Sequence, residues 1–545
     1  MSVERVKTLE KDPSFLIATP KFIILMVTMG IILLLSIVGT TIDVKRHNKD
    51  KQFNMAIGQD LNSKMKEKNV SEVELVKISQ ESLKSKNSLI LDILRSFSVY
   101  SNVRALVNTN LPSDSIRCIH GIRFFGMLWV IMIHSVFFQA DYVKDPPFAY
   151  RMSEDLSSQI LSNSTYSVDT YLFLSGFLVA YLYYKSKRTS GSPVNYLRKL
   201  NEFCMMCFNR FVRLTPPYLF VIILTDVVFT YLRQTSSLES SEQPDVLCSK
   251  YWWRNVLYIN NLYPRSEMCL SWSWYMSLDT QAFVISAMLL IVSTFAFKFA
   301  ASSLIVLILG SMLVTAYKSY SISYIPTMDE QLVHLDDIYD LPWNRIGPYL
   351  VGTATGYFLV EKLQYKLVLG KPFLNYLFEY NERLKFSGYK AILWILFPLL
   401  NLWILFTLYT RQLSVEFSAV YMGISRTLWG IGLAWTLLAC CTGNADRMNK
   451  FLSFPGWIPM SRLTFCAYLL NPLVTNSMFL GTEMGFDSST SGYAITILGI
   501  AFATFFWAFV VSLFFESPFI LITKILLRGI SRTPSNVGNS NTQKP

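Results

Sequence analysis

The fold class follows from one stretch of sequence, Gly121-Ile122-Arg123-Phe124-Phe125-Gly126-Met127-Leu128-Trp129-Val130-Ile131-Met132-Ile133-His134. It belongs to an apolar run over 122–139, and a helix of about 20 apolar residues spans the hydrocarbon core of a bilayer. Similar runs follow it near 166–184, 215–231, 276–297, 302–316, 346–360, 391–409, 424–441, 463–479 and 493–515. A further run, Phe22 to Val38, stands apart ahead of them. The sequence therefore predicts an all-α polytopic membrane protein with about 11 transmembrane helices.

The composition agrees with this prediction. Of the 545 residues, 52% are hydrophobic and only 16% are charged, whereas about a quarter of the residues in an ordinary soluble domain are charged. The net charge of +12 resides in loops between the apolar runs, which indicates membrane topology rather than nucleic-acid binding. We expect the lipid bilayer as a partner, no nucleic acid, no bound cofactor and no metal.

Four segments are predicted along the chain. Residues 1–42 hold an N-terminal tail and the first span, and residues 43–115 form a polar cytoplasmic linker that is partly helical around Val70 to Val107. Residues 116–527 form a ten-helix membrane domain. Residues 528–545 form a disordered cytoplasmic tail.

Lysine and arginine in the short loops predict the orientation, because such residues are retained on the cytoplasmic side. The loop after the second apolar run is strongly basic and is assigned to the cytoplasm; it holds Lys185, Lys187, Arg188, Arg198, Lys199, Arg210 and Arg213. Alternation then places the acidic loop around Asp336 and Asp340 on the luminal side.

Two features on the predicted luminal side agree with this orientation. Asn163-Ser164-Thr165 is a sequon within reach of a glycosyltransferase. Cys248 and Cys269 share an oxidising loop, where a disulfide is expected. Clustered aromatic residues indicate an interfacial belt, with a sugar-binding platform as the alternative; they are Trp252, Trp253, Trp272, Trp274 and Tyr275.

Arg123 and His134 are ionisable residues inside an apolar helix, where burial of a charged group is costly. They are eleven residues apart, so they lie on one face of the helix, about 16 Å apart along its axis. One interpretation is that Arg123 reaches the cytoplasmic headgroups while His134 makes a hydrogen bond between helices. The other is that His134 acts as a general base within the membrane.

Several motifs, in their order along the chain, resemble the membrane-bound acyltransferase 3 superfamily, and most closely its animal nose resistant to fluoxetine branch. Arg123 and His134 form an Arg-x10-His pattern, followed by the motifs of 168–178 and 210–216. Further stretches look like signatures of the animal branch: Tyr251 to Asn255, Tyr258 to Asn261, Trp272 to Tyr275, Arg345 to Gly352 and Ser461 to Leu470. The resemblance covers roughly residues 115–527.

The resemblance implies transfer of an acyl group from a cytoplasmic acyl-CoA to a hydroxyl acceptor at or across the membrane. His134 and Arg123 would then be catalytic, and arginine forks suit the phosphates of such a donor. Donor binding is assigned to Arg210, Arg213 and Glu516. The acceptor side is assigned to Asp279, Trp274, Tyr275, Arg345 and Asn471, while Asp169 is given a structural role.

Two departures from the family pattern bear on activity. Asn471 stands where the pattern usually has a histidine, which leaves two alternatives open, altered chemistry or none. The branch also usually carries a cysteine-rich luminal domain before its first span, whereas about twenty residues precede Phe22.

The leading hypothesis is therefore an acyltransferase that transfers groups other than amino-acyl groups, in the plasma membrane or endoplasmic reticulum. The alternative is a lipid or small-molecule transport protein, or a non-catalytic acyltransferase-like scaffold. Bundles with buried charges serve transport equally well.

Overall fold

The computed structural model describes residues 14–17, 19–66, 89–112, 115–139, 142–143, 155–188, 196–326, 334–364, 388–410, 413–482 and 490–530. Within these ranges the regular elements are all helices, which confirms the predicted fold class. The chain divides into two compact units. The first contains Met1–Ile23, Thr109–Phe208 and Tyr218–Phe509, and the second contains Ile24–Asn108, Asn209–Pro217 and Val510–Pro545.

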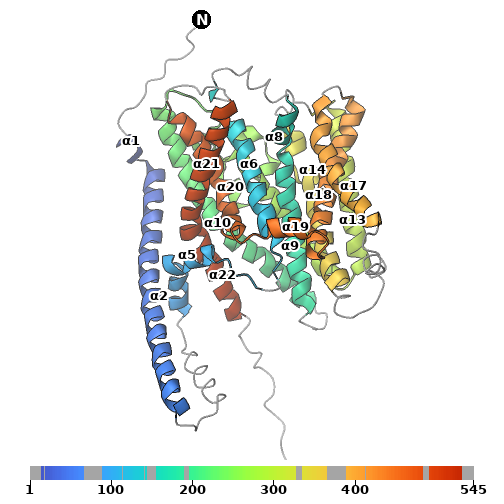
Figure 1. Cartoon of the computed structure of the whole chain (residues 1–545). Coiled ribbons are helices and arrows are strands. Elements are labelled where there is room, and N and C mark those ends of the chain that lie inside the picture. The colour runs from blue at the N-terminus through green and yellow to red at the C-terminus, as the bar shows by residue number, and fades with distance from the viewer. Residues whose placement is uncertain are drawn as a thin grey trace, which may run out of the picture. The chain divides into compact units, whose positions relative to one another are not determined.

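The first unit is a bundle of long helices that run roughly along one direction (Figure 1). Each of the ten apolar runs predicted for the bundle coincides with one of its helices. These are α6 (Cys118–Gln139), α9 (Thr165–Arg188), α10 (Tyr196–Thr235), α12 (Trp274–Ser293), α13 (Phe297–Ser321), α14 (Pro342–Tyr357), α17 (Gly388–Phe406), α18 (Val415–Cys441), α20 (Trp457–Leu480) and α21 (Thr490–Val511).

Short helices connect the long ones in this unit. They are α1 (Ser14–Ile17), η2 (Leu156–Ser158), α8 (Gln159–Ser162), α11 (Pro244–Val256), η3 (Asn260–Leu262), η4 (Arg265–Glu267), η5 (Ser271–Ser273), η6 (Leu335–Tyr339), η7 (Phe358–Gln364), η8 (Thr407–Thr410) and α19 (Asp446–Leu452). Four of them, α11, η3, η4 and η5, form the connection between α10 and α12.

Nine helices in the described part of the chain are long and apolar enough to cross a membrane. The predicted spans that fall outside this set are those of α9 and α14. Helix α14 has only 16 residues, and most of its side chains are buried among neighbouring helices. A helix enclosed by protein need not be apolar all round, because its polar groups meet other helices rather than lipid.

Helices α9 and α14 pack together through glycine. A Cβ atom on Gly352 would lie 2.1 Å from the carbonyl oxygen of Phe173, and one on Gly176 would lie 2.0 Å from that of Tyr349. A Cβ atom on Gly356, one turn after Gly352, would lie 2.7 Å from the carbonyl oxygen of Phe177. This is the small-xxx-small arrangement that lets two membrane helices touch through their backbones.

Large apolar side chains cover the outside of the bundle. Ile305, Val306 and Leu313 of α13 and Leu498 and Phe502 of α21 are all exposed. Exposed apolar surface of this extent is covered by hydrocarbon in a membrane protein. The chain is an integral multi-pass membrane protein.

The second unit contains α2 (Pro20–Lys66) beyond residue 23, α4 (Leu89–Ser96), α5 (Val99–Val107), η9 (Ser512–Glu516), α22 (Ser517–Ile530) and short segments of α10 and α21. The boundary predicted at residue 43 falls inside α2. Asp43 accepts hydrogen bonds from Arg95 at 3.0 Å and from Ser98 at 2.9 Å. This part of the predicted linker is therefore packed helix. Residues 67–88 of the linker and 531–545 of the tail lie outside the described residues.

Candidate functional site

Helices α6 and α20 run in the same direction and meet along a seam of polar side chains. Residues of increasing number on α6, and just beyond its end, contact residues of increasing number on α20. The pairs are His120 with Ser461 at 2.5 Å, Arg123 with Thr464 at 3.2 Å, His134 with Asn471 at 3.0 Å and Tyr142 with Asn476 at 3.0 Å. Arg123 and His134 both face α20, so the shared face predicted from their spacing is confirmed.

His134 is held by a chain of two hydrogen bonds. Its Nδ1 lies 3.0 Å from Asn471 Oδ1, and Asn471 Nδ2 donates to Thr504 Oγ1 of α21 at 3.2 Å. Because the Asn471 amide donates through its nitrogen to Thr504, its oxygen faces the imidazole and accepts the Nδ1 proton. The neutral His134 ring then keeps its Nε2 lone pair for another partner.

Aromatic rings surround the His134 imidazole. Phe138 lies 5.8 Å from it and Tyr468 lies 6.4 Å from it, measured between ring centroids. Trp272 packs edge-on against Phe138 at 5.9 Å, and its backbone oxygen accepts the Tyr468 hydroxyl. Tyr275 in turn contacts Tyr468 at 5.3 Å. Of the predicted acceptor-side residues, Asn471 and Tyr275 therefore lie near His134.

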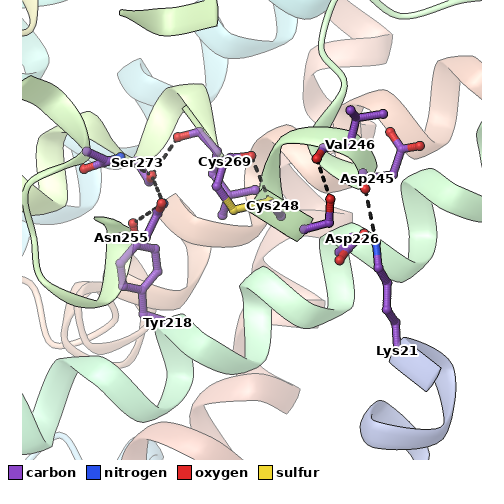
Figure 2. Close-up of a disulfide and its surroundings, with 12 residues drawn as sticks. Lys21, Tyr218, Asp226, Asp245, Val246, Cys248, Asn255, Cys269 and Ser273 are labelled. Carbon is purple, nitrogen blue, oxygen red and sulfur yellow. Dashed lines mark hydrogen bonds and ion pairs between the residues drawn. A yellow bond between two sulfur atoms is a disulfide. The ribbon is translucent and has the colours of Figure 1, made fainter. Parts of the chain in front are cut away.

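The segment that carries Trp272 is tied to α11 (Figure 2). The sulfur atoms of Cys248 and Cys269 are 2.10 Å apart, as the predicted disulfide requires. Beside them, Asn255 donates to the hydroxyl of Tyr218 at 2.8 Å and to that of Ser273 at 3.0 Å. These contacts surround the backbone on both sides of Trp272 and position that residue against the site.

A second polar cluster lies among α9, α14 and α18. Asp169 accepts from Arg345 and from Arg426, each at 3.3 Å. The Trp274 ring lies 5.0 Å from the Arg345 guanidinium. The predicted acceptor-side residues thus separate: Trp274 and Arg345 belong to this cluster, whereas Asp279 is buried on α12.

The predicted aromatic belt is only partly correct. Trp252 and Trp253 are 49% and 40% exposed, as residues at a membrane interface are. Trp272 and Trp274 are buried, because their rings pack against Phe138 and against Arg345. These two rings line the protein interior.

The predicted donor-binding residues belong to the second unit. Arg210 and Arg213 lie on α10, and Glu516 ends η9, where its Oε2 accepts from Ser512 Oγ at 2.7 Å. Arg123 and His134 belong to the first unit. A donor site shared by these residues stays a prediction.

Glycosylation of Asn163 is disfavoured by the structure. Asn163 is 3% exposed, and its Nδ2, the atom that would carry a glycan, donates to the Leu405 carbonyl at 2.7 Å. A glycan would replace one of the two N–H groups of this nitrogen and would have to fit at an enclosed position beside α17. The sequon satisfies the sequence rule, but its asparagine is enclosed.

Sequence reasoning missed His120, Thr464, Thr504 and Arg426. His120 and Arg426 each carried a signal, since both are ionisable residues within or at the end of an apolar run. Thr464 and Thr504 carried none, because hydroxyl residues are common in membrane helices and their role depends on which helix they face.

The family model for an acyltransferase domain, the acyltransferase 3 family, matches residues 116–516. The chain is 27% identical to Nose resistant to fluoxetine protein 6 of Caenorhabditis elegans over 491 residues, which are 84% of this chain and 56% of that protein. It is 25% identical to Regulator of hypoxia-inducible factor 1 of the same organism over 273 residues, which are 44% of this chain and 50% of that protein.

The chain spans about half the length of these curated relatives. No solved structure was found that matches it. The family match nonetheless covers well over half of the chain and includes the whole seam of α6 and α20. The protein therefore belongs to the acyltransferase 3 family and resembles its nose resistant to fluoxetine members.

Proposed function

We propose that the protein is a membrane-embedded acyltransferase in which His134 is the general base. The observation that carries this proposal is the hydrogen-bond chain from His134 through Asn471 to Thr504. An imidazole whose Nδ1–H is held by a neighbouring oxygen presents Nε2 as its basic atom, which is the arrangement that hydrolytic triads use. Family membership supports the same activity.

The proposed step moves an acyl group from an acyl-CoA to a hydroxyl acceptor. His134 Nε2 takes the hydroxyl proton as the oxygen attacks the thioester carbonyl. The new carbon–oxygen bond forms, the carbon–sulfur bond breaks, and the imidazolium returns the proton to the leaving thiolate. Atoms and charge balance without any cofactor.

Arg123 would hold a phosphate of the donor. It lies on the same face of α6 as His134, about three turns away by helix geometry, and its guanidinium is half-buried. The pantetheine arm of coenzyme A is long and unbranched, so phosphates held near Arg123 leave the thioester able to extend toward His134. Arg210, Arg213 and Glu516, in the second unit, are proposed by themselves as donor-binding residues on the cytoplasmic side.

Asn471 changes how the departure from the family pattern is interpreted. From sequence, an asparagine in place of histidine favoured a chain without turnover. Its oxygen lies at hydrogen-bonding distance from His134, which suits an orienting partner of the base. We propose that an asparagine at position 471 preserves acyl transfer and does not abolish it. The plasma membrane or endoplasmic reticulum is the proposed location.

The proposal is tested with purified protein in lipid nanodiscs supplied with radiolabelled acetyl-CoA or palmitoyl-CoA. We measure coenzyme A release and labelled product in the lipid and aqueous fractions. His134→Ala is expected to lower the rate about 10²–10⁴-fold, as loss of a general base does.

The matched control is His334→Ala, which removes a histidine that pairs with Asp337 away from the seam. It should retain the wild-type rate. No product from wild type with either donor, or equal rates for wild type and His134→Ala, would overturn the enzymatic proposal. Lipid uptake by cells that is lost in His134→Ala without any acylated product would instead favour transport.

A further inference from the structure

Two arginines share one carboxylate in the interior of the bundle. Arg345 Nη2 and Arg426 Nη1 each lie 3.3 Å from the same oxygen, Asp169 Oδ2. The Arg345 and Asp169 side chains are fully buried, and that of Arg426 is 7% exposed. We call these three residues the arginine triad.

The arginine triad carries one positive charge in excess. Two guanidiniums, which stay charged in proteins, face a single carboxylate. Within the described part of the chain, the ion pairs of Arg345 and Arg426 are both with Asp169. The nearby carboxylate of Asp340 is already engaged, because Arg265 grips its two oxygens at 2.8 and 3.0 Å.

The excess charge coincides with unused hydrogen-bond donors. Among the described residues, three donors of the arginine triad are buried and have no hydrogen-bond partner: Arg345 Nε, Arg345 Nη1 and Arg426 Nε. One acceptor of the arginine triad, Asp169 Oδ1, is likewise buried without a partner. Arg345 does donate through Nη2 to the Thr165 carbonyl at 3.2 Å. A buried donor without an acceptor is costly, and a buried charge without a counter-charge is more so.

Aromatic rings pack against the guanidinium groups that carry these donors. The Tyr339 ring lies 4.0 Å from the Arg345 guanidinium and 5.4 Å from that of Arg426, and Trp274 covers Arg345 at 5.0 Å. Rings stabilise the faces of a guanidinium but do not accept from N–H groups in its plane. The three unused in-plane donors outnumber the one unused carboxylate oxygen, Asp169 Oδ1, so they call for a further acceptor that carries negative charge.

We propose that the arginine triad binds a monovalent anionic group, supplied by a halide or by a small carboxylate. One negative charge neutralises the excess, and the unused N–H groups of the two arginines supply its hydrogen bonds. The site lies beside α9, α14 and α18, so its occupancy stabilises the packing of these three helices. This inference does not depend on His134 being catalytic.

The test is a thermal-unfolding titration of purified wild type in nanodiscs, followed by intrinsic fluorescence. Sodium gluconate is replaced stepwise by sodium chloride or by sodium acetate at constant ionic strength, because gluconate is too large for an enclosed site. We expect the Tm to rise saturably by about 2 °C, the order expected for a ligand at roughly ten times its Kd. A rise in chloride alone identifies a halide site, and a rise in acetate identifies a carboxylate site.

Variants separate this site from general salt effects. Arg426→Gln removes the excess charge, so it should abolish the anion-dependent shift while the Tm in gluconate is equal to or above that of wild type. Arg345→Gln makes the same test if Arg426→Gln does not fold. The control is Arg254→Gln, because Arg254 has its own carboxylate partner, Glu267, at 2.8 Å; its shift should match that of wild type.

Three outcomes would overturn the proposal. A wild-type Tm that is the same in gluconate, chloride and acetate would show that water alone satisfies the arginines. A shift that persists in both glutamine variants would place the anion effect elsewhere. A lower Tm of both variants in gluconate would show that the arginine triad is a balanced structural cluster.

Discussion

The α9–α14 interface and the α6–α20 seam join parallel helices in different ways. At the first, glycines bring backbone against backbone, so the carbonyl of Phe173 occupies the space that a Cβ of Gly352 would take. At the second, side chains meet through hydrogen bonds of 2.5 to 3.2 Å. Backbone contact fixes the distance and rotation of two helices, whereas side-chain contact leaves polar atoms available to a substrate. The α9–α14 interface is therefore suited to holding the bundle rigid, and the α6–α20 seam is suited to contact with a substrate.

The largest effect is expected from Gly352→Ala at the rigid interface. Its new Cβ would lie 2.1 Å from a backbone oxygen that has no room to move, and overpacking of this kind costs about 3 kcal/mol or more. We expect little monodisperse protein in fluorescence-detected size-exclusion chromatography. Gly310→Ala is the control, because nothing lies within 4 Å of its added Cβ. A normal yield of Gly352→Ala would contradict the backbone-contact interpretation of this interface.

A smaller loss of stability is expected when the disulfide between Cys248 and Cys269 is removed. Cys248→Ser removes a disulfide between residues that are 21 positions apart. In the chain-entropy description, such a disulfide contributes about 3 kcal/mol to the free energy of unfolding. The Tm should fall, and maleimide should label Cys269 without prior reduction. Cys204→Ser, at an exposed thiol outside this pair, should leave the Tm unchanged. Equal Tm values for both variants would mean that the two sulfurs are not bonded in the mature protein.

The smallest change in free energy is expected at the seam itself. Asn471→Leu keeps the branched shape of the side chain but leaves the Nδ1–H of His134 without an acceptor, at a cost of about 1–3 kcal/mol of stability. Acyl transfer should slow about 10–100-fold, and the Tm should fall by a few degrees at most. Asn471→Asp restores an acceptor oxygen and should recover most of the rate. If Asn471→Leu and wild type transfer at equal rates, Asn471 does not orient the base.

The membrane helices of this protein were readily predicted, and their exceptions are instructive. The runs near 302–316 and 493–515 are apolar because they face lipid, so their sequence alone specifies a span. The sequences of α9 and α14 are weaker signals for a membrane span. Other helices enclose these two, so they can carry the charged residues Asp169 and Arg345. The segment boundary predicted at residue 42 falls inside α2, which continues as helix through Asp43.

The candidate site was predicted in part. The spacing of Arg123 and His134 placed both on one face of α6, since eleven residues complete about three turns. The contacts of individual side chains were harder to predict. Arg345 was assigned to an acceptor site, yet it lies in the arginine triad. Asn163 was assigned a glycan, yet its side chain donates to a backbone carbonyl. Nothing local in either stretch of sequence distinguishes these outcomes.

The sequence by itself determined that this chain is a bundle of membrane helices, because the length and apolarity of each run depend only on neighbouring residues. It also determined which face of α6 is polar, through helix periodicity. Only the tertiary structure decided that Asn471 contacts His134 and that Arg426 joins Arg345 on Asp169, across separations of 337 and 257 residues. These pairings depend on how closely the helices approach and how each is rotated, which no local stretch of sequence specifies.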